Sequence, residues 1–436
     1  MTGYLVTNVS LPDGSSGDLG ISDGVFVEPK SIAGARGTVG VDGSGLVALP
    51  GFVDLHTHLR QPGSEQAETI LSGSQSAALG GFTAVHAMAN TDPVADNPGV
   101  TDAVARMGRE AGYVTVRPVG AITKGLAGEE LSAMSAMAGG SGAVRVFSDD
   151  GKCVHDSWVM RRALEHAKAL GAVIAQHAQD PRLTVDAQMN EGALSARLGM
   201  VGWPAVAEES IIARDVLLAE HVGARLHICH LSTAGSVDVI KWAKKRGIAV
   251  TAEVTPHHLL LTEDLVSGFD PVFKVNPPLR TTEDALALRE ALAEGIIDIV
   301  ATDHAPHPSE SKECAFGEAA FGMLGLEMAL PVVLHTMVNS GLMGWSDVAR
   351  VLSSAPAAIG SLGGYDVPLT VGAPGHLTLV DPSTPAPTPR GSLSSNNPYP
   401  EGILPGKVMF TFHHGHATVM EGELVEADVL SGKESR

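Results

Sequence analysis

Short apolar runs alternate with longer amphipathic segments through most of this chain. The runs have the length and composition of buried strands, and the segments between them are long enough for helices. The expected strands are Phe52–Leu55, Thr83–Met88, Val114–Ala121, Ala143–Phe147, Val173–Gln176, Arg225–Cys229, Ala249–Val254 and Ile296–Ala301. The expected helices include Glu68–Leu79, Ser157–Leu170, Ala205–Glu220, Ser236–Lys245 and Glu283–Ala293. Strands that alternate with helices form a parallel sheet, so these units predict an α/β fold, a closed (β/α)8 TIM barrel.

The two ends of the chain show a different pattern, with short β-like runs and no predicted helix before residue 49. The runs are Tyr4–Val9, Gly24–Val27, Thr38–Val41, His376–Val380, Lys407–Phe412 and Ala417–Glu421. The segment Asp381–Pro405 is rich in Pro, Ser and Asn and is predicted as a loop. We expect both ends to pair into one small β-sandwich, built from residues 1–48 and 364–436, beside a catalytic barrel of residues 49–363. Two unrelated tails are the alternative.

Composition narrows the class of protein. The formal net charge of −20 disfavours a nucleic-acid partner. The N-terminus has no basic segment followed by a long apolar run, and no uninterrupted apolar stretch reaches the ~18 residues of a membrane span. The three cysteines are too few and too scattered for a disulfide framework or a CxxC site. We therefore expect a cytoplasmic protein without a membrane partner.

Metal-binding residue types follow five of the eight predicted strands. His56 and His58 end the first strand, and because alternate side chains of a strand share a face, both imidazoles point the same way. The other candidates at strand ends are Asp149, Asp150, His177, His230 and Asp303. Active sites of (β/α)8 barrels lie at the carboxyl ends of the strands, so these side chains should meet on one rim. Each histidine alone could be an ordinary buried strand-end residue; their combination predicts a metal centre.

The mixture of imidazole and carboxylate suits Zn²⁺. The candidates outnumber the ligands of one tetrahedral ion, so we expect one or two zinc ions, with two favoured and a carboxylate shared between them. Two such ions with two carboxylates and a bridging hydroxide keep a net positive charge, which suits an anionic substrate.

Six motifs resemble those of bacterial dihydroorotases, which belong to the amidohydrolase superfamily. They are Gly51–Gly63, Gly80–Thr83, Asn90–Pro93, Phe147–Gly151, Asn276–Leu279 and Thr302–His307. The resemblance covers nearly the whole chain, including the split β-rich ends. The run His56–Arg60 together with Thr302–His307 is the specific part, because an HxH pair alone indicates only the superfamily.

The resemblance implies two zinc sites. One ion would be held by His56, His58 and Asp303, and the second by His177 and His230. Asp303 would also carry the proton in catalysis.

The bridge between the two ions departs from the pattern of many relatives, which use a carbamylated lysine. The fourth strand offers Arg145 at its middle, and Lys152 comes only after two aspartates. Asp150 therefore matches the dihydroorotase subgroup that bridges with aspartate, and Asp149 is the alternative bridge. A simpler alternative is that both aspartates cap the helix that begins near Asp156.

The resemblance also implies the substrate contacts, which are His58, Arg60, Asn90, Asn276, His307, Phe321 and Gly322. Arg60, with Asn90 and His307, would hold a ring carboxylate, because the planar guanidinium fork matches that group. Asn276 and the backbone of residues 321–322 would hold the amide edge of the ring. Turn formation is the alternative for both asparagines, and a surface ion pair is the alternative for Arg60.

The activity implied by the resemblance is zinc-dependent, reversible hydrolysis of (S)-dihydroorotate to N-carbamoyl-L-aspartate, a step of de novo pyrimidine (UMP) biosynthesis. The alternatives are another cyclic amidohydrolase of the allantoinase or hydantoinase type, and a non-catalytic subunit that scaffolds aspartate carbamoyltransferase. Arg60 favours a carboxylate-bearing substrate, and the six retained ligand candidates disfavour the scaffold. The expected partners are a second copy in a homodimer and aspartate carbamoyltransferase. The composition of Pro306–Gly322 suggests a loop over the site.

Overall fold

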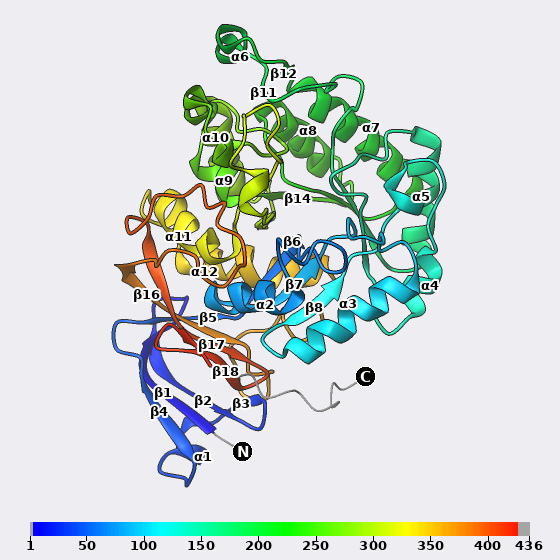
Figure 1. Ribbon diagram of the computed structural model, residues 1–436. Helices are drawn as coiled ribbons and strands as arrows, with labels where there is room; N and C mark the ends of the chain where they lie inside the picture. Colours follow the sequence, from blue (N-terminus) through cyan, green and yellow to red (C-terminus); the bar gives the residue numbers. More distant parts are fainter. Residues whose placement is uncertain (1–2, 426–436) are drawn as a thin grey trace.

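Eight parallel strands lie at the centre of the computed structural model, which describes residues 3–425 (Figure 1). They are β6 (Phe52–Thr57), β7 (Phe82–Ala87), β8 (Thr115–Pro118), β9 (Val146–Phe147), β10 (Val173–Gln176), β13 (Leu226–Ile228), β14 (Val250–Val254) and β15 (Ile299–Val300). Hydrogen bonds order them as β6-β7-β8 and as β15-β14-β13-β10-β9. Parallel bridges from Gly120 to Phe147 and from Thr57 to His304 join the two groups at both ends. The pairings thus form one continuous ring, called the strand ring below.

Helices connect successive strands and cover the outside of the strand ring (Figure 1). The main ones are α2 (Ile70–Leu79), α3 (Pro98–Ala111), α4 (Met134–Gly139), α5 (Ser157–Ala169), α7 (Val206–Val222), α8 (Ala234–Lys245), α9 (Pro256–Leu260) and α10 (Thr282–Ala293). The α/β class predicted from the sequence is confirmed. All eight expected strands are present. Several are shorter than expected, because the hydrogen bonding to neighbouring strands ends before the apolar run does.

Local signals explain where these helices begin. The Thr69 side chain accepts a hydrogen bond from the Ser72 N–H at the start of α2, and Asp156 accepts from Trp158 and Val159 at the start of α5. Such caps satisfy N–H groups that have no partner within the helix. Asp156 is therefore the residue that caps α5, and Asp149 and Asp150 do not cap this helix.

One insertion and a long terminal helical run complete the strand ring. After β10 the chain forms the small pair β11 (Met189–Asn190) and β12 (Gly202–Trp203), with α6 (Ala193–Leu198) between them. After β15 follow α11 (Ala329–Val333), η6 (Leu334–Val338), α12 (Trp345–Ala349), η7 (Arg350–Ser354) and α13 (Ala355–Ile359).

Both ends of the chain lie in one nine-stranded sheet. Its strands are β1 (Gly3–Ser10), β2 (Ser16–Ser22), β3 (Val25–Val27), β4 (Thr38–Asp42), β5 (Val47–Pro50), β16 (Leu377–Pro385), β17 (Pro405–His413), β18 (His416–Met420) and β19 (Glu423–Leu424). The antiparallel pair of β5 and β16 joins the N-terminal to the C-terminal strands, which lie side by side in blue and in orange to red in Figure 1.

Three details of the sequence analysis are wrong in this sheet. A short helix, α1 (Pro29–Ile32), lies in the first part, where no helix was predicted, because Pro29 opens one helical turn that buries Ile32. Strands β2, β5 and β19 were not predicted, and the sequence of β2 lacks a regular alternation of apolar and polar residues. The predicted loop Asp381–Pro405 is shorter, because β16 continues to Pro385 and β17 begins at Pro405. Residues 1–2 and 426–436 of the predicted end segments lie outside the described residues.

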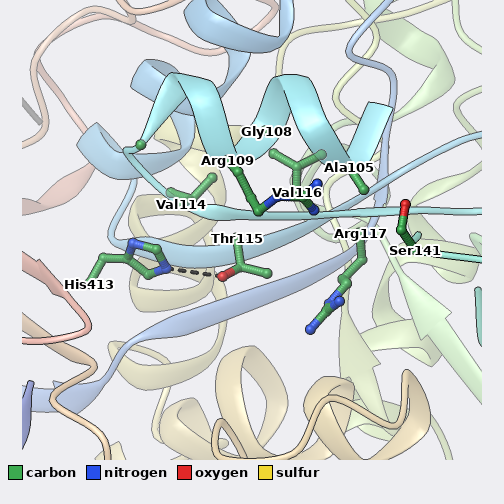
Figure 2. A pocket seen from close by; sticks show the side chains of 10 residues that line it. Ala105, Gly108, Arg109, Val114, Thr115, Val116, Arg117, Ser141 and His413 are labelled. Atoms are coloured by element: carbon green, nitrogen blue, oxygen red, sulfur yellow. Dashed lines mark hydrogen bonds between the residues drawn. The ribbon is translucent and has the colours of Figure 1, made fainter. Parts of the chain in front are cut away.

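One apolar core joins the strand ring to the nine-stranded sheet, since it includes Val47, Leu49 and Val408 of the sheet. A second apolar core lies within the sheet. On β8, Thr115 Oγ1 lies 3.0 Å from Nε2 of His413, which ends β17 (Figure 2). A cavity of about 220 Å³ opens beside this contact, between α3, β8 and His413. Among residues 3–425, no helix combines the length and apolar character that crossing a bilayer requires.

Candidate metal centre

His56 and His58 stand at the carboxyl end of β6, as expected from their shared strand face. The Nε2 atom of His58 lies 3.0 Å from Asp303 Oδ1 and 3.3 Å from Asp150 Oδ2. The Nε2 atom of His56 lies 3.4 Å from the same Asp303 oxygen and 3.3 Å from Asp150 Oδ1. Two ring nitrogens and two carboxylates thus face one another in a buried space.

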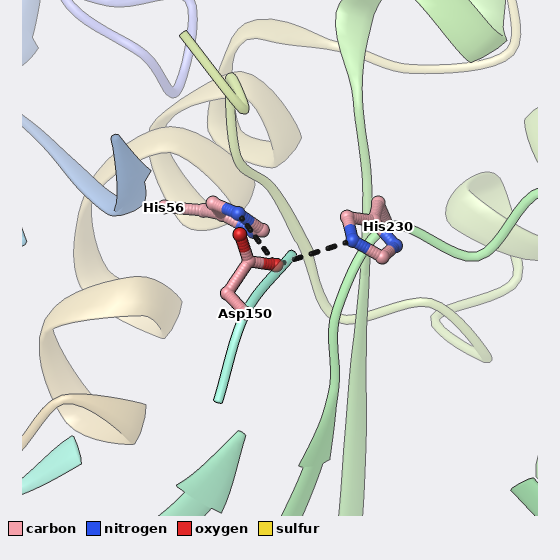
Figure 3. A group of neighbouring side chains, drawn as sticks. All are labelled: His56, Asp150 and His230. Atoms are coloured by element: carbon pink, nitrogen blue, oxygen red, sulfur yellow. Dashed lines mark ion pairs between the residues drawn. The ribbon is translucent and has the colours of Figure 1, made fainter. Parts of the chain in front are cut away.

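His177 and His230 lie on the other side of Asp150. Asp150 Oδ1 is 3.2 Å from Nδ1 of His177 and 3.5 Å from Nε2 of His230. Figure 3 shows this carboxylate between His56 and His230. Asp150 contacts all four histidines, which is the position that a ligand shared by two ions requires.

The nitrogen and oxygen atoms of the cluster are arranged better for binding a divalent metal than for hydrogen bonding among themselves. The Nε2 atom of His56 is buried and has no hydrogen-bond partner among the described residues. The facing nitrogens of His177 and His230 are 2.8 Å apart, and at most one neutral imidazole can donate to the other. Imidazole nitrogens and carboxylate oxygens at this spacing form two groups suited to an ion, namely His56–His58–Asp303 and His56–Asp150–His230.

Electrostatics keep both carboxylates ionised. Burial alone would raise the pKa of Asp150, but His56, His177 and His230 outweigh it and hold that pKa well below its usual value. Burial likewise opposes ionisation of Asp303, and His56 and His58 outweigh it, so the pKa of Asp303 is also lowered.

Several of these residues hold unusual backbone conformations. The φ angles of Arg60, His230 and Asp303 are 59°, 31° and 47°. A residue other than glycine pays roughly 1–3 kcal/mol in this left-handed region, and such strain is concentrated at functional sites. The surrounding packing therefore holds these side chains in place against their local preference.

Arg60 and His307 form the partly exposed side of the cluster. Arg60 donates from Nε to the Pro306 carbonyl at 3.1 Å, and its Nη2 is 3.3 Å from His307 Nε2. The same His307 atom lies 2.8 Å from the Phe321 carbonyl, a distance that favours donation to that oxygen. Burial and then Arg60 lower the pKa of His307 to about 3, so it is neutral near pH 7. An acceptor placed here would satisfy the remaining Arg60 N–H groups.

Gly322 brings the backbone against His307. Its φ of 146° is accessible to glycine, and a Cβ atom there would lie 2.8 Å from both His307 Nε2 and the Ala305 side chain. The structure therefore brings residues 321–322 to the same place as Arg60, as the sequence analysis expected.

Asn90 and Asn276 reach the cluster through other polar groups. The Oδ1 atom of Asn90 lies 2.9 Å from His58 Nδ1. Asn276 donates from Nδ2 to Gln179 Oε1 at 3.2 Å, and that oxygen also lies 2.8 Å from His177 Nε2. The Oδ1 atom of Asn276 is buried and has no partner among the described residues. Both asparagines therefore lie at the site rather than in a remote turn.

A family model described as "Dihydro-orotase-like" matches residues 45–236. A dihydroorotase of Leifsonia xyli is 60% identical over 97% of this chain and 98% of its own length. A dihydroorotase of Streptomyces coelicolor is 57% identical over 97% of this chain and 100% of its own length. The chain belongs to the dihydroorotase family.

Solved structures of dihydroorotase-like fold include more distant proteins. L-hydantoinase (dihydropyrimidinase) of Arthrobacter aurescens has a TM-score of 0.85 and covers 98% of both chains at 24% identity. Dihydropyrimidinase of Brevibacillus agri has a TM-score of 0.80 at 20% identity. These likenesses show that this member of the dihydroorotase family shares their overall fold.

The alternatives for the bridging residue differ in their surroundings. Asp149 accepts hydrogen bonds from the N–H groups of Ile122 and Thr123, at 2.7 and 2.9 Å, and from the Thr123 hydroxyl. Lys152 is exposed. Asp150 is the one of the three that faces the histidines, which favours it as the shared ligand.

Two residues of the site were missed from the sequence. Gln179 supports His177 and Asn276, and Glu253 lies 2.6 Å from His56 Nδ1 through its Oε1 atom. Burial opposes ionisation of Glu253, yet His56 and His227 lower its pKa to about 2. The available signal was a lone glutamate inside the apolar strand Val250–Val254, since a buried charge needs a partner. His257 is also buried, and neither of its ring nitrogens has a hydrogen-bond partner among the described residues.

Proposed function

We propose that this chain catalyses the reversible hydrolysis of the cyclic amide (S)-dihydroorotate to N-carbamoyl-L-aspartate, in de novo pyrimidine biosynthesis. The main support for this proposal is that four histidines and two aspartates lie together in one buried cluster, with Arg60 at its exposed side. The 60% identity to a dihydroorotase supports the same substrate.

The metal in this proposal is zinc, with two ions per chain. His56, His58 and Asp303 would hold one ion, and His177 and His230 the other. Asp150 would be shared, and the chain would then belong to the subgroup that uses aspartate instead of a carbamylated lysine. When bound, such ions activate water near neutral pH and polarise a carbonyl group.

Asp303 would carry the proton between the two reacting groups. In hydrolysis it accepts a proton from the attacking water as the new C–O bond forms, and it donates that proton to the ring nitrogen as the C–N bond breaks. In ring closure the same proton moves in the opposite order. The position of Asp303 supports this role, because its carboxylate lies within 3.4 Å of the ring nitrogens of both His56 and His58 in the buried cluster.

Arg60 would bind the carboxylate of the substrate. Its free N–H groups face the exposed side of the cluster, where Asn90 and His307 add polar contacts. Asn276 and the backbone of residues 321–322 would hold the amide edge, which orients the scissile bond toward the buried cluster.

Finer features of the architecture belong to the same proposal. The strand ring would be the closed (β/α)8 barrel of a catalytic domain, residues 49–363. The nine-stranded sheet would be a β-sandwich domain formed by residues 1–48 and 364–436. A cytoplasmic homodimer, with aspartate carbamoyltransferase as a partner, completes the proposal.

A comparison of substrates tests this function. Purified protein loaded with zinc is assayed with dihydroorotate, hydantoin and allantoin at equal concentrations. We expect turnover of dihydroorotate far above that of the other two, because only dihydroorotate carries the carboxylate that Arg60 would bind. Preference for hydantoin or allantoin would establish the other class of cyclic amidohydrolase, and absence of any turnover would favour a scaffold.

A further inference from the structure

Glu253 is a fully buried carboxylate in the middle of the strand ring. It lies on β14 between apolar neighbours and has 0% of its surface exposed. A charge in such a place is stable only when neighbouring groups compensate it. The groups that compensate the charge of Glu253 therefore indicate the role of this residue.

Three groups from two other strands approach the Glu253 carboxylate. Oε1 lies 2.6 Å from His56 Nδ1 and accepts the N–H of His230 at 3.2 Å. Oε2 lies 2.9 Å from Nε2 of His227, whose Nδ1 is 2.8 Å from Thr251 Oγ1. One carboxylate thus contacts two of the four histidines of the candidate metal centre and is anchored on its far side by His227.

These contacts determine which nitrogen of His56 carries the proton. An ionised carboxylate only accepts hydrogen bonds, so the Nδ1 atom of His56 carries a proton in this contact. The Nε2 atom faces Asp150 and Asp303, at 3.3 and 3.4 Å, and is the ring nitrogen left to bind a metal. Imidazole commonly binds a metal through one nitrogen while the other donates its N–H to a carboxylate.

The same carboxylate also holds the turn of His230. That residue has a φ of 31°, outside the usual range for a side-chain-bearing residue. The hydrogen bond from its N–H to Glu253 supports this conformation at the point where the side chain turns toward Asp150.

We propose that Glu253, anchored by His227, is a positioning residue that sets the tautomer of His56 and the orientation of His230 for metal binding. The inference rests on the metal centre of the proposed function. Strand β14 supplies none of the six ligand candidates. Through Glu253 it would orient two of them, His56 and His230, for metal binding.

Two substitutions at position 253 distinguish the effect of the hydrogen bonds from the effect of the negative charge. Glu253→Gln keeps an oxygen that accepts from His56, and its amide N–H can donate to His227 if that ring moves its proton to Nδ1, beside the Thr251 hydroxyl. Glu253→Ala removes all three contacts. The control is Asp215→Ala, because Asp215 is an equally buried carboxylate that contacts Gln176 and Arg214 instead of a ligand histidine.

The experiment measures zinc affinity of the metal-stripped full-length proteins by competition with a chromogenic chelator, alongside circular dichroism and melting temperature. We expect Glu253→Ala to lose about ten- to a hundred-fold in affinity, the usual cost of losing a residue that orients a metal ligand. Glu253→Gln should lose less, and the control should bind as the parent does. Equal zinc binding by parent and Glu253→Ala, or an equal loss in the control, would overturn the inference.

Two further measurements keep the inference testable. If Glu253→Ala does not fold, His227→Leu replaces it, because that change removes only the anchor behind Glu253 and should also weaken zinc binding. Imidazole nitrogen NMR of the parent, with His56→Gln used for assignment, should show His56 protonated at Nδ1; an unprotonated Nδ1 would contradict the proposal. A parent that binds no zinc would instead contradict the metal centre itself.

Discussion

At the scale of single residues, the site divides into buried groups that face one another and partly exposed groups around them. The six ligand candidates are buried, whereas Arg60, Asn90, Asn276 and His307 are partly exposed. This division fits a metal centre covered by its substrate, with charge chemistry inside and recognition at the opening. It makes separate predictions for the two groups.

Replacement of Arg60 by methionine keeps most of its volume and removes its charge. A charge-assisted hydrogen bond contributes about 1.5–3 kcal/mol, so the Arg60→Met variant should bind dihydroorotate roughly ten- to a hundred-fold more weakly. Steady-state kinetics on the zinc-loaded variant measures this as a rise in KM, and the zinc content should stay at the parent level. Unchanged KM and kcat would exclude Arg60 from the substrate site.

Replacement of Asp303 by asparagine removes the proton carrier together with a metal ligand. Turnover should nearly vanish in both directions, since hydrolysis and ring closure use the same group. Zinc analysis of the variant tells the two roles apart, because a variant that keeps its zinc and loses activity isolates the proton transfer. Near-normal rates would mean that another residue carries the proton.

At the scale of elements, the sequence predicts the site well where ligands follow strands. The carboxyl ends of parallel strands meet on one edge, so His56, His177 and Asp303 were placed together without any knowledge of distances. Gln179 and Glu253 could not be placed in this way. Gln179 lies in a loop whose path depends on packing, and Glu253 acts from within a strand, where periodicity alone predicts an apolar residue.

The short strand β9 also explains why Asp150 is the residue that we propose as the bridge. It ends at Phe147, and the following turn brings Asp150 back toward the histidines. An aspartate carries its charge permanently, whereas a carbamylated lysine forms only from carbon dioxide. Stripped protein reloaded with zinc should therefore recover equal activity in carbon-dioxide-free buffer and in bicarbonate. Recovery that requires bicarbonate would assign the bridge to a modified lysine such as Lys152.

The segment Pro306–Gly322 was expected to cover the site, and the structure shows what holds it. Lys274, which is 2% exposed, donates from Nζ to the carbonyls of Phe316 and Gly317 at 2.7 and 3.0 Å, and its own carbonyl accepts from the Gly322 N–H at 3.0 Å. Lys274→Met should therefore raise KM for dihydroorotate while the zinc content stays unchanged. Exposed Lys241→Met is the control, and an unaltered KM in Lys274→Met would show that this segment does not position the substrate.

At the scale of the whole molecule, a group of histidines lies where the strand ring meets the nine-stranded sheet, and two of them, His413 and His376, are buried. His413 lies beside Thr115 and Tyr365, and its ring packs near His414 and His376, with centroids 4.5 and 5.4 Å away. Burial, and then the neighbouring histidines, keep the pKa of His413 well below its ordinary value of 6.5. The return of β-like runs near the C-terminus predicted that the two ends of the chain pair with each other. The polar contacts among these histidines could not be predicted, because they join side chains that are far apart in the sequence.

The lowered pKa of His413 makes a prediction for stability in acid. Below pH 6.5 the unfolded chain binds a proton at this residue and the folded chain does not, so the free energy of unfolding falls as pH falls. His413→Gln keeps a polar side chain beside Thr115 and should lose less stability between pH 7 and pH 5 than the parent. Denaturant unfolding at both pH values measures this, with exposed His335→Gln as the control. An identical loss in His413→Gln and the parent would contradict the assignment.

We propose that the buried cluster binds the metal with which this chain hydrolyses dihydroorotate. The most direct test titrates zinc into metal-stripped protein and follows the hydrolysis of dihydroorotate at each addition. We predict no activity without zinc, a rise in proportion to the zinc added, and saturation at one or two equivalents per chain. Dihydroorotate turnover that is independent of zinc, or stoichiometric zinc binding without turnover, would show that this cluster is not the catalytic metal centre.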